Sequence, residues 1–130
     1  MSASAEVLQG DIYWVTAKDL KSMDITGGEQ KNARPYVIVS RDQINRFRRN
    51  IVGIPLTKQL HQGCSYRITL PLEWQIPNPA SSRPLMKCVC LSDHIRVLDK
   101  IRLEQPKMGS LSDTARYGLI GALATIFDIP

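Results

Sequence analysis

The chain has 130 residues, a length typical of one domain with its own core, so we expect residues 1–130 to form a single domain. A net charge of +5 and a pI near 9.3 permit nucleic-acid or acidic protein partners without requiring either. Three cysteines, Cys64, Cys88 and Cys90, are odd in number and lack metal-ligand spacing, which favours free thiols in a reducing cytoplasm. Neither a signal-peptide pattern nor a membrane-length apolar run is present, since the longest nearly apolar run covers only residues 118–127.

Short segments rich in β-branched and aromatic residues predict a series of strands. Pro55 has no N–H to donate to a neighbouring strand. We therefore expect the C-terminal end of the segment Ile51–Thr57 to lie at a sheet edge or a bulge. The predicted strands are Asp11–Thr16, Tyr36–Ser40, Ile51–Thr57, Tyr66–Leu70, Lys87–Leu91, Ile95–Leu98 and, as a last candidate, Ile101–Gln105.

Two polar stretches separate these strands. Lys18–Ala33 carries Gly27-Gly28 near its middle and has the length of a binding loop. Pro71–Pro84 contains four prolines, so we expect an excursion without regular structure.

Helical signals are few. Asp42–Phe47 is long enough for a single helical turn. At the C-terminal end, Ser110 and Asp113 resemble a capping box, and apolar residues then recur at helical spacing. Gly118 and Gly121 each cost about 1 kcal/mol in a helix interior, which suggests close approach by another backbone, in the core or across a dimer.

Several short strands followed by one helix indicate a mainly β fold with helical additions. The arrangement that fits this order is a small antiparallel barrel or a strongly bent sheet.

The segment from residue 31 to residue 58 is the candidate site. Arg34 stands before the second predicted strand, Pro35 biases it toward an extended backbone, and Thr57 ends the third. Seven basic residues and a single acid, Asp42, lie in this window. An arginine and a threonine on rigid strands beside a basic connector suit a polyanion with a reacting phosphate.

Most standard site motifs are missing. The chain has no Gly-rich phosphate loop followed by Lys-Ser/Thr, no HExxH and no paired CxxC. Any catalysis would therefore use arginine, threonine and carboxylate groups, which suits phosphate chemistry performed by positioning and charge stabilisation.

The chain resembles the MazF/PemK family of toxin endoribonucleases from bacterial toxin–antitoxin pairs. The combination of Gly-x-Glu-Gln, Arg-Pro and Pro-x-Thr, in that order, carries the specificity of the match. The similar segments are GDIYWV (Gly10–Val15), GGEQKNARPYVIVS (Gly27–Ser40), IVGIPLTKQ (Ile51–Gln59), VCLSDHIRVLDKIRL (Val89–Leu103) and the closing helix.

The resemblance implies a homodimeric SH3-like barrel, as in CcdB and MazF, that cleaves single-stranded RNA without a metal or other cofactor. It also implies a cognate acidic antitoxin as partner. Arg34 and Thr57 match the family's catalytic arginine and threonine, and Glu29 matches a carboxylate implicated in some members. Gln30 and Lys31 fall in the loop that covers RNA. The further candidates for RNA binding are Lys58, Arg46, Arg48, Arg96 and His94.

Each candidate also has a structural interpretation. Arg34 would otherwise pair with Glu29 or Asp93, and Thr57 would be a strand-end hydroxyl. The arginines after residue 45 would form a solvated connector. The identity of the general base stays open between Glu29, His94 and another group, because an arginine gives up its proton reluctantly.

Three other side chains have two interpretations each. His94 is either structural or catalytic, Arg96 reaches either a phosphate or Asp99, and Trp74 either stacks on a base or plugs the barrel.

Two rival functions remain at this level. One is a gyrase poison of the same fold, like CcdB, although this chain lacks the C-terminal tryptophan signature of those proteins and ends Phe127-Asp-Ile-Pro130. The other is a barrel that binds RNA or a protein without catalysis.

Overall fold

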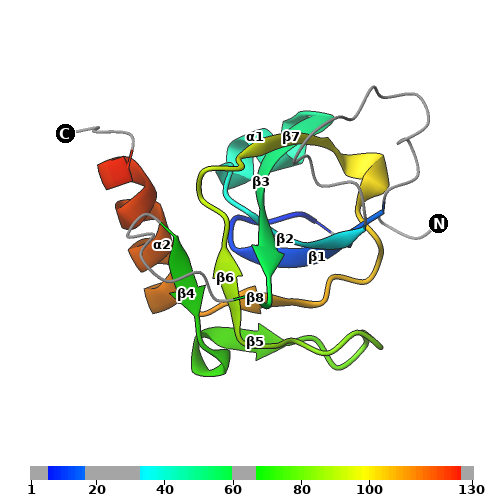
Figure 1. The fold of residues 1–130 in the computed structure, drawn as a ribbon. Coiled ribbons are helices and arrows are strands. Elements are labelled where there is room, and N and C mark those ends of the chain that lie inside the picture. Colours follow the sequence, from blue (N-terminus) through cyan, green and yellow to red (C-terminus); the bar gives the residue numbers. More distant parts are fainter. Residues whose placement is uncertain (1–5, 17–32, 60–66, 127–130) are drawn as a thin grey trace.

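The structure is a computed structural model that describes residues 6–16, 33–59 and 67–126 (Figure 1). Two helices lie in these ranges, α1 (Asp42–Phe47) and α2 (Asp113–Ile126), with single 3-10 turns at η2 (Leu72–Trp74) and η3 (Lys100–Arg102). The strands are β1 (Asp11–Val15), β2 (Arg34–Ile38), β3 (Asn50–Thr57), β4 (Ile68–Leu70), β5 (Gln75–Pro77), β6 (Cys88–Cys90), β7 (Arg96–Asp99) and β8 (Gly109–Leu111).

The strands pair antiparallel in the order β4-β6-β3-β2-β1-β8-β5, and β7 pairs with β3 beside this path. Gln75, the buried first residue of β5, links the two ends of the order. Its side-chain amide donates hydrogen bonds to the carbonyl oxygens of Leu70 at 3.2 Å and Met86 at 2.9 Å. The sheet is therefore a nearly closed barrel, and the predicted mainly β fold with a C-terminal helix is confirmed.

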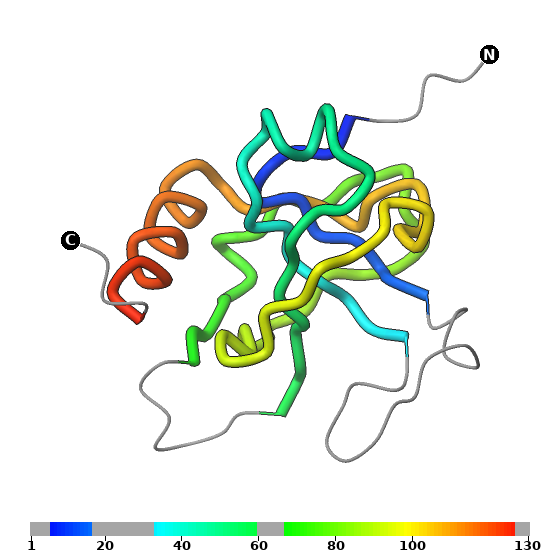
Figure 2. The backbone as a smooth tube through the Cα atoms, turned by 90° about the horizontal axis from the view of Figure 1, so that it is seen from above, coloured from blue at the N-terminus to red at the C-terminus, as the bar shows by residue number. Residues whose placement is uncertain are grey.

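Strand β3 pairs with three other strands, and it changes partners along its length. Its first half pairs with β7, which runs beside it in Figure 2, and its last two residues pair with β6. Pro55 lies between these two pairings and opposite Tyr36 of β2. Of the two predicted positions for Pro55, a sheet edge or a bulge, the edge is wrong, because β3 pairs with β2 at this residue and the missing N–H falls where β3 leaves β7 for β6. The Pro55 carbonyl accepts a hydrogen bond from the Leu91 N–H at 3.0 Å.

Apolar side chains on both faces of β2 create two cores, as expected for a strand buried on both sides. Val37 packs in the core that α2 covers, whereas Tyr36 and Ile38 face the second core. Burial of each large aliphatic side chain contributes about 1.5–3 kcal/mol. The helix contributes Ala115, Leu119 and Leu123 to the first core, which confirms the predicted apolar face.

The start of α2 differs from the prediction by two residues. Ser112, not Ser110, caps the helix, and its Oγ accepts a hydrogen bond from the Ala115 N–H at 3.2 Å. Ser110 lies in β8 opposite Asp11.

Other differences concern very short elements. Ile101–Gln105 is not a strand, because η3 is followed there only by an isolated bridge between Leu103 and Val15. The proline-rich stretch holds η2 and β5, and β5 pairs with β8, so part of it is regular. Residue 66, the expected start of the fourth strand, lies outside the described residues.

Gly118 and Gly121 are exposed on α2. A Cβ built on either glycine meets no atom of the described chain within 4 Å. The interpretation in which these glycines admit another backbone of the core is therefore wrong. In the described ranges, no helix has the length and apolar character needed to cross a membrane.

Candidate active site

Arg34 is the first residue of β2 and lies opposite Val15 of β1. Pro35 follows it and fixes the chain in the extended form that the strand requires. The Arg34 side chain is half-buried, and its Nε is buried without a hydrogen-bond partner in the described part of the chain. A guanidinium held by its stem in this way keeps its donors available to a ligand.

Thr57 is the last residue of β3 and lies opposite Val89 of β6. Its Oγ1 accepts a hydrogen bond from the Gln59 N–H at 3.2 Å. Because the oxygen is engaged as an acceptor, the hydroxyl proton is left to donate to a ligand.

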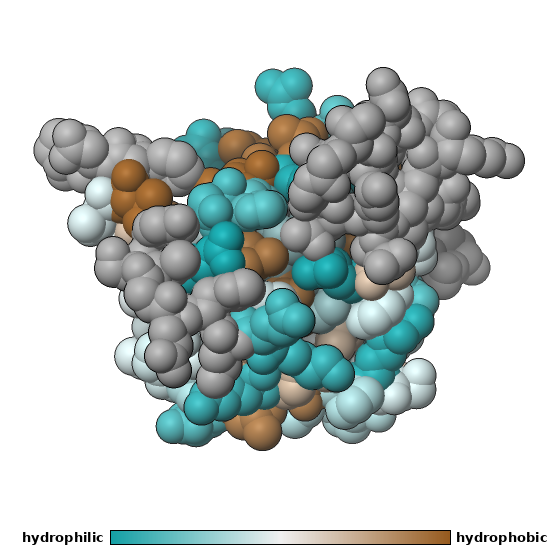
Figure 3. Space-filling model, in the orientation of Figure 1, coloured by the Kyte–Doolittle hydropathy of each residue, from teal (hydrophilic) through white to brown (hydrophobic). Residues whose placement is uncertain are grey.

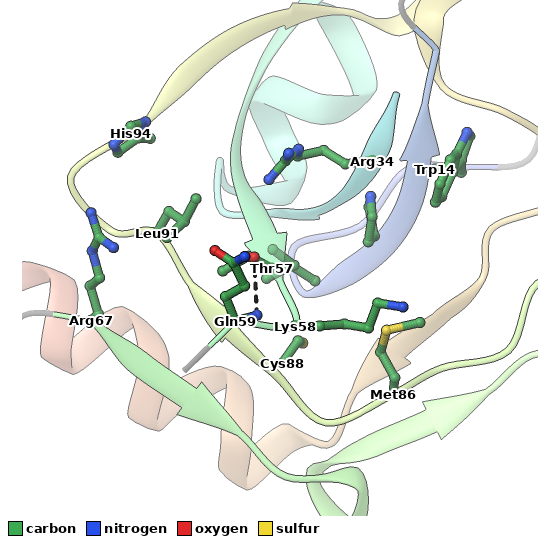
Figure 4. A pocket seen from close by; sticks show the side chains of 12 residues that line it. Trp14, Arg34, Thr57, Lys58, Gln59, Arg67, Met86, Cys88, Leu91 and His94 are labelled. Carbon is green, nitrogen blue, oxygen red and sulfur yellow. Dashed lines mark hydrogen bonds between the residues drawn. The ribbon is translucent and has the colours of Figure 1, made fainter. Parts of the chain in front are cut away.

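A cleft of about 680 Å³ opens between the ends of β2 and β3, where their pairing stops after Tyr36 and Pro55. Figure 4 shows Arg34 and Thr57 together in it, with the Arg34 guanidinium pointing toward the side that carries His94. The described residues that line the cleft are Trp14, Arg34, Pro35, Leu56, Thr57, Lys58, Gln59, Arg67, Met86, Cys88, Leu91 and His94.

One side of the cleft is apolar. Trp14 and Met86 contribute to it, and the Arg83 guanidinium lies 4.0 Å from the centroid of the Trp14 ring. Burial raises the pKa of Cys88 to about 11, so its thiol is neutral at physiological pH and is not an activated nucleophile. Hydrophobic surface shows between the hydrophilic side chains near the centre of the face in Figure 3. Apolar side chains therefore form one part of the cleft wall.

The opposite side of the cleft carries Arg67 and His94, and Asp93 lies beside both. Arg67 forms an ion pair with Asp93, with Nη2 to Oδ2 at 3.1 Å and Nε to Oδ1 at 3.2 Å. His94 Nε2 lies 3.5 Å from the same Oδ2. Burial tends to raise the pKa of Asp93, but hydrogen bonds from Arg67 and from its own backbone N–H, with the nearby positive charge, hold it below its ordinary value. Asp93 is therefore a carboxylate at neutral pH.

The structure brings four of the predicted site residues into this cleft: Arg34, Thr57, Lys58 and His94. In the alternative structural interpretation Arg34 pairs with Glu29 or Asp93, but Asp93 forms its ion pair with Arg67. Gln59 also lines the cleft, immediately after the predicted Lys58.

Three predicted arginines lie elsewhere. Arg46, on α1, pairs with Glu6 at 2.6 Å, and Arg48 follows the end of that helix. Arg96 lies on β7 opposite Gly53 and does not line the cleft. Its suggested partner Asp99 pairs instead with Arg49 at 2.8 Å.

Some predictions concern residues away from the cleft or outside the structure. Trp74 is half-exposed on η2 and is absent from the cleft lining. Glu29, Gln30 and Lys31 lie outside the described residues, as does Cys64.

Sequence reasoning missed Trp14 and Arg67. Trp14 belonged to a correctly predicted strand, but the pattern of that strand did not show that its side chain would line the same cleft as Arg34. Arg67 stands beside a stretch outside the described residues and carries no local signal. The described residues contain no cluster of three His, Cys, Asp or Glu side chains suited to a metal ion.

Comparison with known proteins identifies the family of the chain and solved structures with a similar fold. The model of the PemK-like, MazF-like toxin of type II toxin–antitoxin systems matches residues 8–127. An endoribonuclease from a mycobacterial species is 23% identical, with 99% of this chain and 98% of that chain covered and a TM-score of 0.64. MazF from Deinococcus radiodurans is 20% identical, with 97% and 100% covered and a TM-score of 0.67. A mycobacterial endoribonuclease solved with its cognate antitoxin is 23% identical, with 98% of each chain covered and a TM-score of 0.64. The comparison with curated proteins found no match.

Proposed function

Since the chain belongs to the PemK-like, MazF-like toxin family of type II toxin–antitoxin systems, we propose that it is an endoribonuclease that cleaves single-stranded RNA. Messenger RNA in the cytoplasm is the natural substrate of such a toxin. The observation that carries the proposal is the meeting of Arg34 and Thr57, distant in the sequence, in one cleft. Residues 1–130 act as a single domain in this proposal.

The reaction is attack by a ribose 2′-oxygen on the adjacent phosphorus. The bond from the 2′-oxygen to phosphorus forms, the bond to the 5′-oxygen breaks, and a 2′,3′-cyclic phosphate and a 5′-hydroxyl result. Negative charge gathers on the non-bridging phosphate oxygens in the transition state. A planar guanidinium can donate two parallel hydrogen bonds to those oxygens, so Arg34 is the group that stabilises them.

Thr57 and Lys58 support the same phosphate. The Thr57 hydroxyl donates to one oxygen while Gln59 holds its position, and Lys58 supplies positive charge at the rim of the cleft. Glu29, Gln30 and Lys31 belong to the segment proposed to cover the RNA. No metal or cofactor takes part.

Other basic residues contribute at a distance. We propose that Arg46, Arg48 and Arg96 raise RNA affinity through their charge rather than through contact with the scissile phosphate. This assignment follows from their positions outside the cleft.

The proposed partners are a cognate acidic antitoxin and a second copy of the chain. Two solved relatives are complexes with an antitoxin: a mycobacterial endoribonuclease with its cognate antitoxin, and MazE-MazF from Deinococcus radiodurans. An acidic, partly disordered segment laid over the basic cleft would block Arg34 from RNA.

The test is incubation of the purified protein with a pool of single-stranded RNA in EDTA, followed by mapping of cut sites and termini. We expect cleavage that leaves 2′,3′-cyclic phosphate and 5′-hydroxyl ends. Cleavage that requires a divalent metal, or binding without cleavage, would overturn the proposal. The second outcome would favour the non-catalytic RNA-binding barrel, and inhibition of gyrase would favour the CcdB-like alternative.

A further inference from the structure

His94 is the histidine that lies in the cleft with Arg34 and Thr57. It follows β6 and precedes β7, and its N–H donates a backbone hydrogen bond to the Leu91 carbonyl at 2.8 Å. This turn holds the imidazole at the cleft wall with 28% of its side chain exposed. Figure 4 shows the Arg34 guanidinium pointing across the cleft toward it.

Charged groups of both signs lie around His94. The Asp93 carboxylate lies 3.5 Å from Nε2 and is held in place by two hydrogen bonds from Arg67. The cations Arg34 and Lys58 line the same cleft. Because the carboxylate lies beside Nε2, Nδ1 is the ring nitrogen on the side away from it.

We propose that His94 is the general acid of the RNA cleavage proposed above and that Asp93 is its positioning residue. As the bond between phosphorus and the 5′-oxygen breaks, Nδ1 of the imidazolium gives its proton to that oxygen, which leaves as a hydroxyl. Solvent water accepts the proton of the attacking 2′-hydroxyl, and His94 regains a proton from solvent after the product departs. The step rests on the proposed nuclease function.

In this assignment Arg34 stabilises charge on one side of the cleft and His94 donates a proton on the other. Arg34 cannot serve as a proton donor at neutral pH because an arginine guanidinium remains protonated, whereas a histidine changes charge in that range. Among the described cleft residues, the Cys88 thiol, whose pKa burial raises to about 11, is too weak an acid for the role. A histidine is the residue type in this lining whose ordinary charge change falls near neutral pH, which makes His94 our candidate for the proton transfer.

The test compares two substrates that carry one mapped cleavage site. One is ordinary RNA, and the other has sulfur in place of the scissile 5′-oxygen, so that its leaving thiolate needs no proton. Wild-type protein, His94→Ala and His94→Gln are assayed on both. We expect each variant to lose about 10²–10⁴-fold in rate on the ordinary RNA and to stay within a few-fold of wild type on the sulfur substrate.

Asp93→Asn gives a readout that a structural role would not produce. Asp93→Asn removes the group that positions the imidazole, so the rate on ordinary RNA should fall several-fold while the rate on the sulfur substrate stays close to that of wild type. A loss of the same size on both substrates would remove Asp93 as a positioning residue. Circular dichroism and thermal melting identify variants that fail to fold.

The outcomes separate the two proposals. If wild-type protein cuts neither substrate, the nuclease function fails. If wild-type protein cuts and His94→Gln is equally fast on ordinary RNA, or equally impaired on both substrates, the general-acid role is overturned while the nuclease function stands.

Discussion

Arg34 begins β2 and Thr57 ends β3, and the register that sets Tyr36 opposite Pro55 leads, two residues further, to Arg34 opposite Thr57. Hydrogen-bonded pairing between the strands stops before that point, and β3 continues against β6 instead. The two side chains therefore share an opening rather than a sheet interior. The cleft that we propose for the scissile phosphate follows from this change of partner.

Replacement of Arg34 should damage cleavage far more than RNA binding. Arg34→Ala removes one charge-stabilising donor group, a loss of about 10²–10³-fold in rate. Arg34→Lys should be nearly as poor, because a lysine lacks the planar fork. Single-turnover cleavage of a mapped site measures the rate, and Arg41→Ala, an exposed arginine outside the cleft, is the matched control. Wild-type rates in both Arg34 variants would remove Arg34 from the mechanism.

Thr57 offers an isosteric test. Thr57→Val keeps the shape and removes the hydroxyl, and we expect roughly a tenfold or greater loss in cleavage rate, about the value of one hydrogen bond to a charged group. Thr57→Ser keeps the hydroxyl and should keep most of the activity. Equal rates for the valine and serine variants would mean that the hydroxyl takes no part.

Much of the fold was predictable from local patterns. The strand at Asp11–Val15 and the helical turn at Asp42–Phe47 were placed within one residue because composition and length define them. The strands β5 and β8 were missed, because their short segments contain proline or glycine and lack a clear run of β-branched and aromatic residues. They are strands because they pair with each other and because β8 also pairs with β1, and no local window contains these partners.

Some residues of the candidate site were also predictable from the sequence, and others were not. Arg34 and Thr57 were predicted from their places at strand ends and from the family resemblance. Trp14 and Arg67 join them only because the barrel closes, and closure depends on long-range register. The position of Arg46 shows the opposite error, since nearness in sequence to Arg34 did not bring it to the cleft.

Gly109 should tolerate no side chain. A Cβ at this position would press on the backbone carbonyl of Ile76 and come within 2.8 Å of Leu85 Cδ1. Because backbone atoms of a paired strand cannot easily move aside, Gly109→Ala should lower the free energy of unfolding by about 1–3 kcal/mol. The neighbouring Ser110→Ala should change it by less than about 0.5 kcal/mol. Urea denaturation of both variants gives the comparison, and equal stabilities would contradict the close approach of β5 and β8.

The ion pair of Asp93 with Arg67 predicts a pH dependence of stability. The pKa of Asp93 is below its ordinary value of 3.8 in the folded chain, so the folded state favours the carboxylate. The resulting stability is present above pH 3.8 and disappears as the pH falls through the lower, folded-state value. Because the pair is partly exposed, Asp93→Asn should cost at most about 1 kcal/mol at neutral pH. Denaturation at pH 7 and at pH 2–3 should show this difference shrinking in acid; a constant difference would argue that the charge is irrelevant.

The exposed glycines of α2 test the proposed homodimer. A Cβ at Gly118 or Gly121 meets open space within the described chain, so in a monomer each Gly→Ala change should stabilise the helix by about 1 kcal/mol. If a second copy packs its backbone against this face, the added methyl groups instead separate the copies. We expect the double variant to shift sedimentation from dimer toward monomer at micromolar concentration.

Thr114→Ala, on an exposed position of the same helix, is the control and should leave the dimer intact. A double glycine variant that gains stability and sediments like wild type would place the dimer contact on another face. The helix would then keep its glycines for a reason unrelated to self-association, because neither the core nor the partner copy would require the space that they leave.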